Sequence, residues 1–108
     1  MNRKKKKILI VDDEHQVIQM LSDLLVSWGY QVRGAQSAHE ALDSFSGNDF
    51  NLVIADFRMP EMDGLEFMQK LRELDPQCPF IFLTGDASEE TAVKTLEAGA
   101  DDYLVKPV

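Results

Sequence analysis

The chain has 108 residues, of which 44% are hydrophobic and 28% are charged, and its formal net charge is -8. This length suits one folded domain over residues 1–108, and the composition is that of a globular protein rather than a disordered or fibrous one. The negative charge argues against direct binding of nucleic acid or of an anionic membrane, because like charges repel, so any DNA-binding role would need another domain.

The cysteine content and the N-terminal residues do not indicate secretion. The single cysteine, Cys78, excludes an internal disulfide and offers no pair of thiol ligands, which suits a reducing cytoplasmic setting. A basic run at residues 3–7 precedes only four apolar residues. A secretory signal needs about 7 to 15 apolar residues, and a membrane span needs more. We therefore interpret the basic run as a solvated flank of the first strand.

Strands and helices alternate from the first apolar run onward. Residues 8–11 are continuously apolar, which predicts a strand buried on both faces. Apolar residues with helical spacing follow as far as Gly29, which is placed to end that helix. These residues are Val17, Leu21, Leu24, Leu25 and Trp28. We expect Trp28 to anchor the end of the helix in the core, and we predict a second strand over residues 30–35.

The middle of the chain repeats the pattern. Ser37 and Glu40 have the spacing of a capping box, which opens a helix that ends at Gly47. A third apolar run covers residues 52–55, and turn signals follow at residues 59–60 and 63–64. The next helical spacing ends at Pro76.

The last third contains two more apolar runs, at residues 80–83 and 103–105, separated by a helix that Ser88 caps and Gly99 ends. Four strand and helix units followed by a fifth strand predict an α/β fold with a parallel sheet and helices on both faces. The sequence stops at Val108, where a further covering helix would be expected. We therefore expect the last helix to be missing from this chain.

Polar residues follow four of the five predicted strands directly. Asp12 and Asp13 follow the first, Asp56 the third, Thr84 the fourth and Lys106 the fifth. Taken singly, each residue is most often a turn or cap residue. Their joint occurrence predicts a shared site, because the carboxyl ends of parallel strands lie along one edge of the sheet, where such folds bind ligands.

The residue types at this edge favour phosphoryl chemistry. Two carboxylates about 4 Å apart repel by roughly 4 kcal/mol at an effective dielectric near 20, so the site needs a proton or a cation. Magnesium fits best, because it binds a few carboxylates, waters and phosphate oxygens. Asp56 is the candidate nucleophile, Asp12 and Asp13 the candidate metal ligands, and Thr84 and Lys106 the groups that would contact the transferred phosphoryl.

The sequence pattern as a whole resembles the receiver domain of two-component response regulators. The resemblance rests on Asp12-Asp13, on Asp56 followed by Met59-Pro60 and Asp63-Gly64, on Thr84-Gly85, on Gly99-Ala100-Asp101 and on Lys106-Pro107. It implies a doubly wound, flavodoxin-like sheet of order 2-1-3-4-5. It also implies a cytoplasmic signalling switch that catalyses only its own phosphorylation and dephosphorylation.

The resemblance also implies roles for individual residues. Asp56 would accept a phosphoryl group from a sensor histidine kinase, a histidine phosphotransfer protein or acetyl phosphate. Mg²⁺ would be held by Asp12 or Asp13, by Asp56 and by the backbone carbonyl of Arg58. Thr84 and Tyr103 would move on phosphorylation, a cis peptide would join Lys106 to Pro107, and the output would be a homodimer contact or a linked domain.

Two positions that vary in this family, Arg58 and Asp86, are expected to tune the rate of dephosphorylation. His15 and His39 lie on predicted helix surfaces without a kinase-like setting, so we interpret them as solvated residues. Two alternatives stay open at this point. One is a pseudo-receiver that binds a partner without phosphorylation, and the other is a magnesium-dependent phosphohydrolase, which would often carry an acid where Arg58 stands.

Overall fold

A computed structural model describes residues 6–45, 50–85 and 89–106, and for residues 89–92 it describes the backbone only. The strands are β1 (Lys7–Val11), β2 (Gln31–Ala35), β3 (Leu52–Asp56), β4 (Phe80–Thr84) and β5 (Asp102–Val105). The helices are α1 (His15–Ser27), α2 (Ala38–Phe45), α3 (Gly64–Leu74) and α4 (Glu89–Glu97). The alternation read from the sequence is confirmed.

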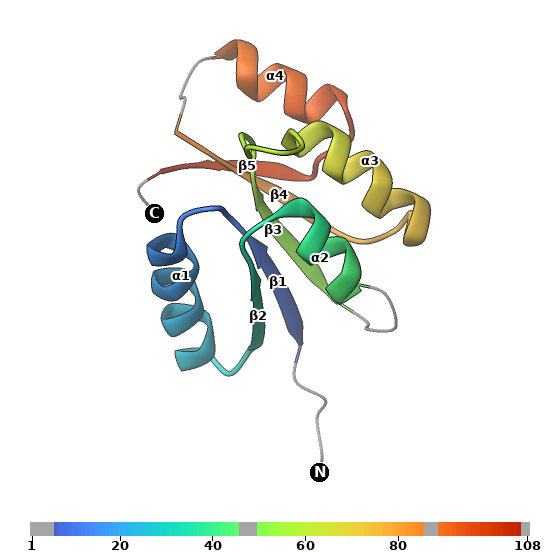
Figure 1. The fold of residues 1–108 in the computed structure, drawn as a ribbon. Helices are drawn as coiled ribbons and strands as arrows, with labels where there is room; N and C mark the ends of the chain where they lie inside the picture. Colours follow the sequence, from blue (N-terminus) through green and yellow to red (C-terminus); the bar gives the residue numbers. More distant parts are fainter. Residues whose placement is uncertain (1–5, 46–49, 86–88, 107–108) are drawn as a thin grey trace.

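The five strands form one parallel sheet in the order β2-β1-β3-β4-β5 (Figure 1). This is the order that the receiver resemblance implied. It arises because a helical crossover connects each strand to the next, and the direction of progress reverses after β2, when the chain passes over β1 to add β3 on its other side. The reversal leaves β1 and β3 side by side in the centre, so the ends of the first and third strands are neighbours.

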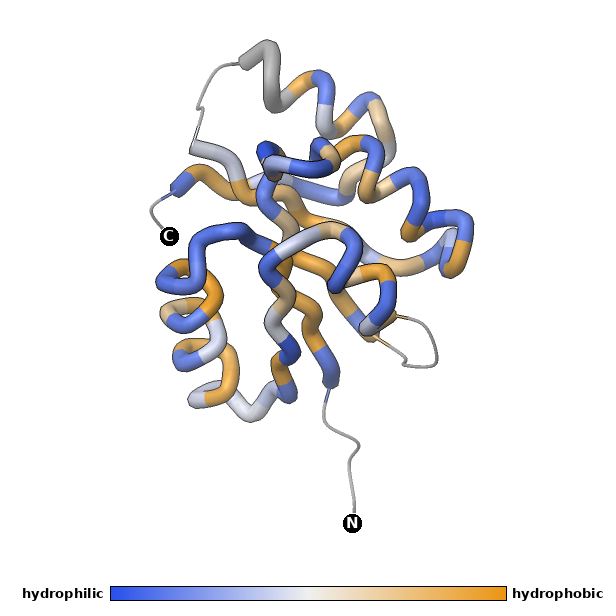
Figure 2. Tube along the Cα trace, in the orientation of Figure 1, coloured by the Kyte–Doolittle hydropathy of each residue, from blue (hydrophilic) through white to orange (hydrophobic). Residues whose placement is uncertain are grey.

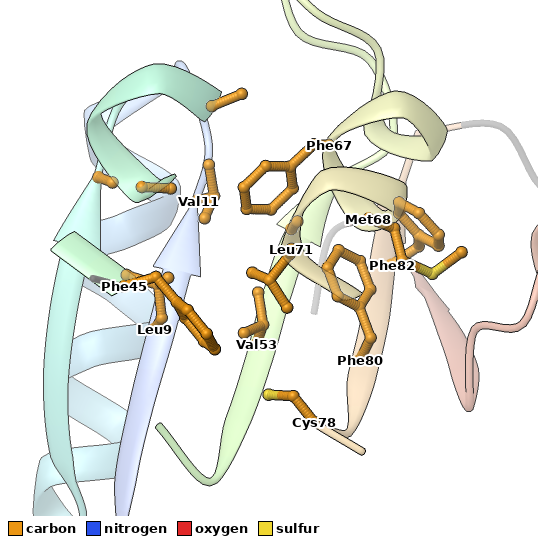
Figure 3. Packing of buried hydrophobic residues seen from close by; sticks show 14 of the residues in the cluster. Leu9, Val11, Phe45, Val53, Phe67, Met68, Leu71, Cys78, Phe80 and Phe82 are labelled. Atoms are coloured by element: carbon orange, nitrogen blue, oxygen red, sulfur yellow. The ribbon is translucent and has the colours of Figure 1, made fainter. Parts of the chain in front are cut away.

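Alternate residues of the central strands face opposite sides of the sheet, as the strand period requires. Leu9 and Val11 join a large cluster with α2 and α3, whereas Ile8 and Ile10 join a smaller cluster with α1. Figure 3 shows the first cluster, in which aromatic rings from β4 and α3 pack together, with centroids 5.8 Å apart for Phe67 and Phe80. Figure 2 shows continuous hydrophobic runs along the central strands, whereas hydrophobic and hydrophilic residues alternate along the helices.

Two glycines end helices where the sequence predicted. Gly29 and Gly99 have φ angles of 94° and 109°, a left-handed conformation that other residues adopt at a cost. The N-terminal cap of α2 is confirmed as well, because the hydroxyl of Ser37 accepts a hydrogen bond from the backbone of Glu40 at 3.1 Å. The predicted helix end at Gly47 and the predicted cap at Ser88 lie outside the described residues.

Two burial predictions were wrong. Trp28 is 65% exposed, because it is the C-cap residue of α1 and the chain turns away at Gly29 immediately after it. Leu104 and Val105 are 39% and 37% exposed, because β5 is an edge strand with a neighbour on one side only. β1, β3 and β4 are buried on both faces as predicted.

Among the described residues, no helix has the length and apolar character needed to span a membrane.

Candidate functional site at the carboxyl edge of the sheet

The predicted site residues lie together at the carboxyl edge of the sheet. Val11 is aligned with Ala55 in the register, so the next residues, Asp12 and Asp56, stand level with each other. Thr84 ends the neighbouring strand, and its carbonyl accepts a hydrogen bond from the backbone of Lys106 at 2.8 Å. The parallel register therefore brings four separate segments of the chain to one place.

The three aspartates form a compact set of oxygen atoms. One carboxylate oxygen each from Asp12, Asp13 and Asp56 lie within 4.8 Å of one another. Asp12 is 0% exposed and Asp56 is 6% exposed, while Asp13 faces solvent. A cation could therefore be held by two buried ligands and reached from solvent past the third.

Lys106 extends its ammonium into this acidic set. Its Nζ lies 2.9 Å from Oδ2 of Asp12, 3.4 Å from Oδ2 of Asp56 and 3.5 Å from Oε1 of Glu14. The contact with Asp56 has the geometry of a hydrogen bond. The shorter contact with Asp12 does not, since Asp12 Oδ2 has no partner among the described residues that meets hydrogen-bond geometry. The ammonium is thus shared between carboxylates rather than fixed on one.

Backbone amides hold the other oxygens of the two buried aspartates. The N–H of Glu14 donates to Oδ1 of Asp12 at 2.9 Å, and the N–H of Arg58 donates to Oδ1 of Asp56 at 3.3 Å. Both amides lie two residues after their acceptors, which is the Asx-turn arrangement of a strand that ends on aspartate. Each carboxylate is therefore oriented by its own local turn before any ligand arrives.

The ionisation of these groups reflects their burial. Burial raises the pKa of Asp12 above its ordinary value of 3.8, against the opposing effects of the Glu14 amide and of Lys106. Burial also raises the pKa of Asp56, and the negative charge of Asp12 adds to this effect. Burial alone would lower the pKa of Lys106, but its contacts with Asp12 and Asp56 outweigh burial and raise the pKa. The charged form of Lys106 is therefore favoured, whereas the ionised forms of the two buried carboxylates are disfavoured.

The loop after Asp56 is positioned by two backbone hydrogen bonds and by a glycine. The N–H of Phe57 donates to the carbonyl of Leu83 at 2.8 Å, and the N–H of Gly64 donates to the carbonyl of Phe57 at 2.9 Å. A Cβ atom on Gly64 would lie 2.6 Å from Cε1 of Phe82 and 3.0 Å from the carbonyl oxygen of Asp56. The chain can fold this tightly against β4 only because residue 64 has no side chain.

The remaining predicted residues fall into three groups. Thr84 is 2% exposed at the end of β4, and the half-buried Tyr103 packs against the larger core cluster. The side chain of Arg58 is exposed beside the site. Asp86 and the peptide bond between Lys106 and Pro107 lie outside the described residues.

The two histidines do not join the site. His15 is exposed at the start of α1, and Nε2 of His39 lies 3.8 Å from Oε2 of Glu61, with both side chains well exposed. The residue that sequence reasoning missed is Glu14, whose side chain contacts Lys106. The only sequence signal for it was its place as the third acid in the run Asp12-Asp13-Glu14.

Comparison with known proteins agrees with this geometry. A family model described as the response regulator receiver domain matches residues 8–108. The transcriptional regulatory protein ZraR of Salmonella typhimurium is 44% identical over 108 residues, which are 100% of this chain and 24% of that relative. The regulatory protein AtoC of Escherichia coli is 41% identical over 94% of this chain and 22% of its own length. The chain thus spans about a quarter of the length of these curated relatives.

Solved structures show the same arrangement of the backbone. A CheY-like receiver domain protein from Methanospirillum hungatei superposes with a TM-score of 0.89 at 40% identity, over 97% of this chain and 84% of that chain. The chemotaxis protein CheY4 from Vibrio cholerae superposes with a TM-score of 0.92 at 34% identity, over 97% and 89% of the two chains. The likeness therefore extends over the whole sheet and its helices.

Proposed function

Because the chain belongs to the response regulator receiver domain family, whose members are phosphorylation-controlled signalling switches, we propose that Asp56 accepts the phosphoryl group. The observation that supports this most strongly is the setting of its carboxylate. It is buried at the end of β3, with Lys106 3.4 Å from one oxygen and the N–H of Arg58 3.3 Å from the other. The donor would be a sensor histidine kinase, a histidine phosphotransfer protein or a small acyl phosphate.

The transfer requires little covalent chemistry from the protein. A carboxylate oxygen of Asp56 attacks phosphorus and forms an acyl phosphate, while the bond from phosphorus to the donor's nitrogen or oxygen breaks and its electron pair leaves with the donor. Lys106 already lies within reach of Asp56 and offsets negative charge on the incoming group. The chain would catalyse only this transfer to itself and the hydrolysis of the acyl phosphate, in which water attacks phosphorus, inorganic phosphate is released and the carboxylate of Asp56 is restored.

The donor set also fits a divalent cation. Three carboxylate oxygens within 4.8 Å of one another are the hard ligands that such ions prefer. Asp12, Asp13, Asp56 and the backbone carbonyl of Arg58 would hold Mg²⁺. When bound, it would neutralise the aspartates and attract the oxygens of the phosphoryl group.

The response to phosphorylation would use the residues on the other side of Asp56. Thr84 would donate a hydrogen bond to the phosphoryl oxygens, and Tyr103 would change its rotamer, which alters the surface of α4 and β5. A phosphoryl group can shift the equilibrium only through such differential contacts. The output would be a homodimer contact or a linked domain.

Arg58 and Asp86 would set the lifetime of the phosphorylated form. Asp86 would order the attacking water, or Arg58 would shield the acyl phosphate. The substitution Asp86→Ala should lengthen the phosphorylated lifetime, and an unchanged lifetime would remove the first of these roles.

Incubation with acetyl phosphate and Mg²⁺ tests the central proposal. Intact-mass measurement should detect one added phosphoryl group on the wild-type protein and none on Asp56→Asn. Asp43→Asn, an exposed aspartate on α2, is the matched control and should be labelled like the wild type. Labelling of Asp56→Asn to the same extent as wild type would refute the assignment.

The same incubation tests the first alternative, and a separate assay with a phosphate monoester tests the second. A folded wild-type protein that takes no label would favour a pseudo-receiver that binds its partner without phosphorylation. Repeated release of phosphate from a phosphate monoester would favour a phosphohydrolase. Arg58 argues against a phosphohydrolase. Such enzymes often carry an acidic residue at this position, and its carboxylate would supply the acid and base chemistry.

A further inference from the structure

The side chain of Glu14 contacts Lys106 of the site and is not used to cap the helix that it precedes. It is the N-cap residue of α1, but its side chain makes no capping hydrogen bond. Its backbone carbonyl accepts from the N–H groups of Val17 and Ile18, and its own N–H donates to Asp12. The backbone therefore performs the structural role of this residue, and the carboxylate is left to lie 3.5 Å from Nζ of Lys106.

The three carboxylates around Lys106 differ in depth. The side chains of Asp12 and Asp56 are 0% and 9% exposed, whereas that of Glu14 is 64% exposed. Asp12 and Asp56 also belong to the set of oxygens that fits a cation, and Glu14 does not. The ammonium thus touches two inner carboxylates that a cation would use and one outer carboxylate that it would not.

A divalent cation and the ammonium of Lys106 compete for the same inner oxygens, because their positive charges repel each other at contact distance. The closest contact of Lys106 is with Oδ2 of Asp12, at 2.9 Å. A cation on the inner oxygens therefore disfavours the position of the ammonium against Asp12. Among the described residues, Glu14 is the remaining carboxylate in contact with it.

We propose that Glu14 is a positioning residue for Lys106, whose carboxylate holds the ammonium at the outer side of the pocket when a divalent cation engages Asp12 and Asp56. This inference rests on the proposed function, since it concerns the cation and the lysine of that site. Without the carboxylate of Glu14, the ammonium of Lys106 stays in contact with Oδ2 of Asp12, and its charge weakens the binding of the cation there. Glu14 thereby lets both positive charges occupy one acidic pocket and keeps Lys106 within reach of the phosphoryl group.

A double-mutant cycle read by calorimetric Mg²⁺ binding tests this role, because it separates a contact with Lys106 from the general field of one negative charge. Glu14→Gln should weaken Mg²⁺ binding by about 2- to 5-fold, the range expected for a partly exposed ion pair. In the Lys106→Met background, the same substitution should change the dissociation constant much less. The control Glu61→Gln removes an equal charge from a carboxylate that contacts His39, and it should have the same small effect in both backgrounds.

Equal weakening by Glu14→Gln with and without Lys106 would overturn the positioning role and leave the proposed function intact. Absence of Mg²⁺ binding by the folded wild-type protein would overturn this inference together with the metal assignment. Because Lys106→Met can also destabilise the fold, a second measurement uses ¹³C-labelled lysine in the wild-type and Glu14→Gln proteins. Saturating Mg²⁺ should move the Cε resonance of Lys106 less in Glu14→Gln, and identical shifts would refute the proposal.

Discussion

Replacing Asp56 with asparagine should stabilise the metal-free protein at neutral pH, although it removes the proposed phosphoacceptor. The carboxylate is buried, and burial together with the charge of Asp12 raises its pKa above 3.8. A carboxylate whose pKa is higher in the folded than in the unfolded state destabilises the fold wherever it is ionised. Asparagine keeps an oxygen that can accept the hydrogen bond from Arg58 but carries no charge.

The size of the effect follows from three opposing contributions. Repulsion between oxygens of Asp12 and Asp56 no more than 4.8 Å apart costs at least about 3.5 kcal/mol at an effective dielectric of 20. Attraction to Lys106 at 3.4 Å returns about 5 kcal/mol on the same scale. The net attraction of at most about 1.5 kcal/mol is smaller than the burial penalty of several kcal/mol for an ion. We therefore expect Asp56→Asn to raise the free energy of unfolding by about 1 to 3 kcal/mol.

Urea unfolding followed by circular dichroism in the presence of EDTA measures this difference. It should be largest at pH 8 and shrink as the pH falls toward 4, because the wild-type carboxylate then takes up its proton in the folded state. Asp43→Asn controls for the loss of one negative charge and should change the free energy of unfolding little. A less stable Asp56→Asn at pH 8, or a gain that does not vary with pH, would refute the reasoning. Mg²⁺ should then stabilise the wild type more than the variant.

Three further substitutions test the framework around the site. Asp63→Ala removes the side chain that accepts from the N–H of Glu66 at the start of α3, and urea unfolding should register a loss of about 1 kcal/mol. Phe67→Ala empties a fully buried position and should cost about 3 to 5 kcal/mol in the same assay. Gly64→Ala places a methyl group 2.6 Å from Phe82 and should cost about 1 to 3 kcal/mol, together with slower labelling by acetyl phosphate.

The sheet and most of its site could be predicted from the sequence because both depend on features with little freedom. Short continuous apolar runs such as residues 52–55 favour a buried strand over a helix, and parallel strands must present their carboxyl ends on one edge. Once Asp12 and Asp56 follow two such strands, the register alone sets them level. The positions of the strand ends in the sequence were therefore enough to predict that Asp12 and Asp56 lie close together.

The features that sequence reasoning missed depend on tertiary neighbours. Helical spacing identified an apolar stripe on α1, but it does not say how far the stripe extends beyond its contacts, and Trp28 lies past that limit. The exposure of Leu104 follows from the place of β5 at the edge of the sheet. The contact between Glu14 and Lys106 joins a residue before α1 to one after β5 through two flexible side chains, which no local pattern encodes.

Burial of two carboxylates at the acidic edge is expected to lower the free energy of unfolding. A ligand that neutralises these carboxylates is expected to raise it again. The amides of Glu14 and Arg58 each hold one oxygen of Asp12 and Asp56, and these hydrogen bonds oppose a movement of the two carboxylates away from each other. Any cation or phosphoryl group that changes the charge at this edge therefore changes the contacts of Lys106, because its ammonium contacts both carboxylates. Lys106 directly follows β5, in which Leu104 and Val105 are exposed, so under the proposed function we expect a change of charge at Asp56 to affect this surface strand through the side chain of Lys106.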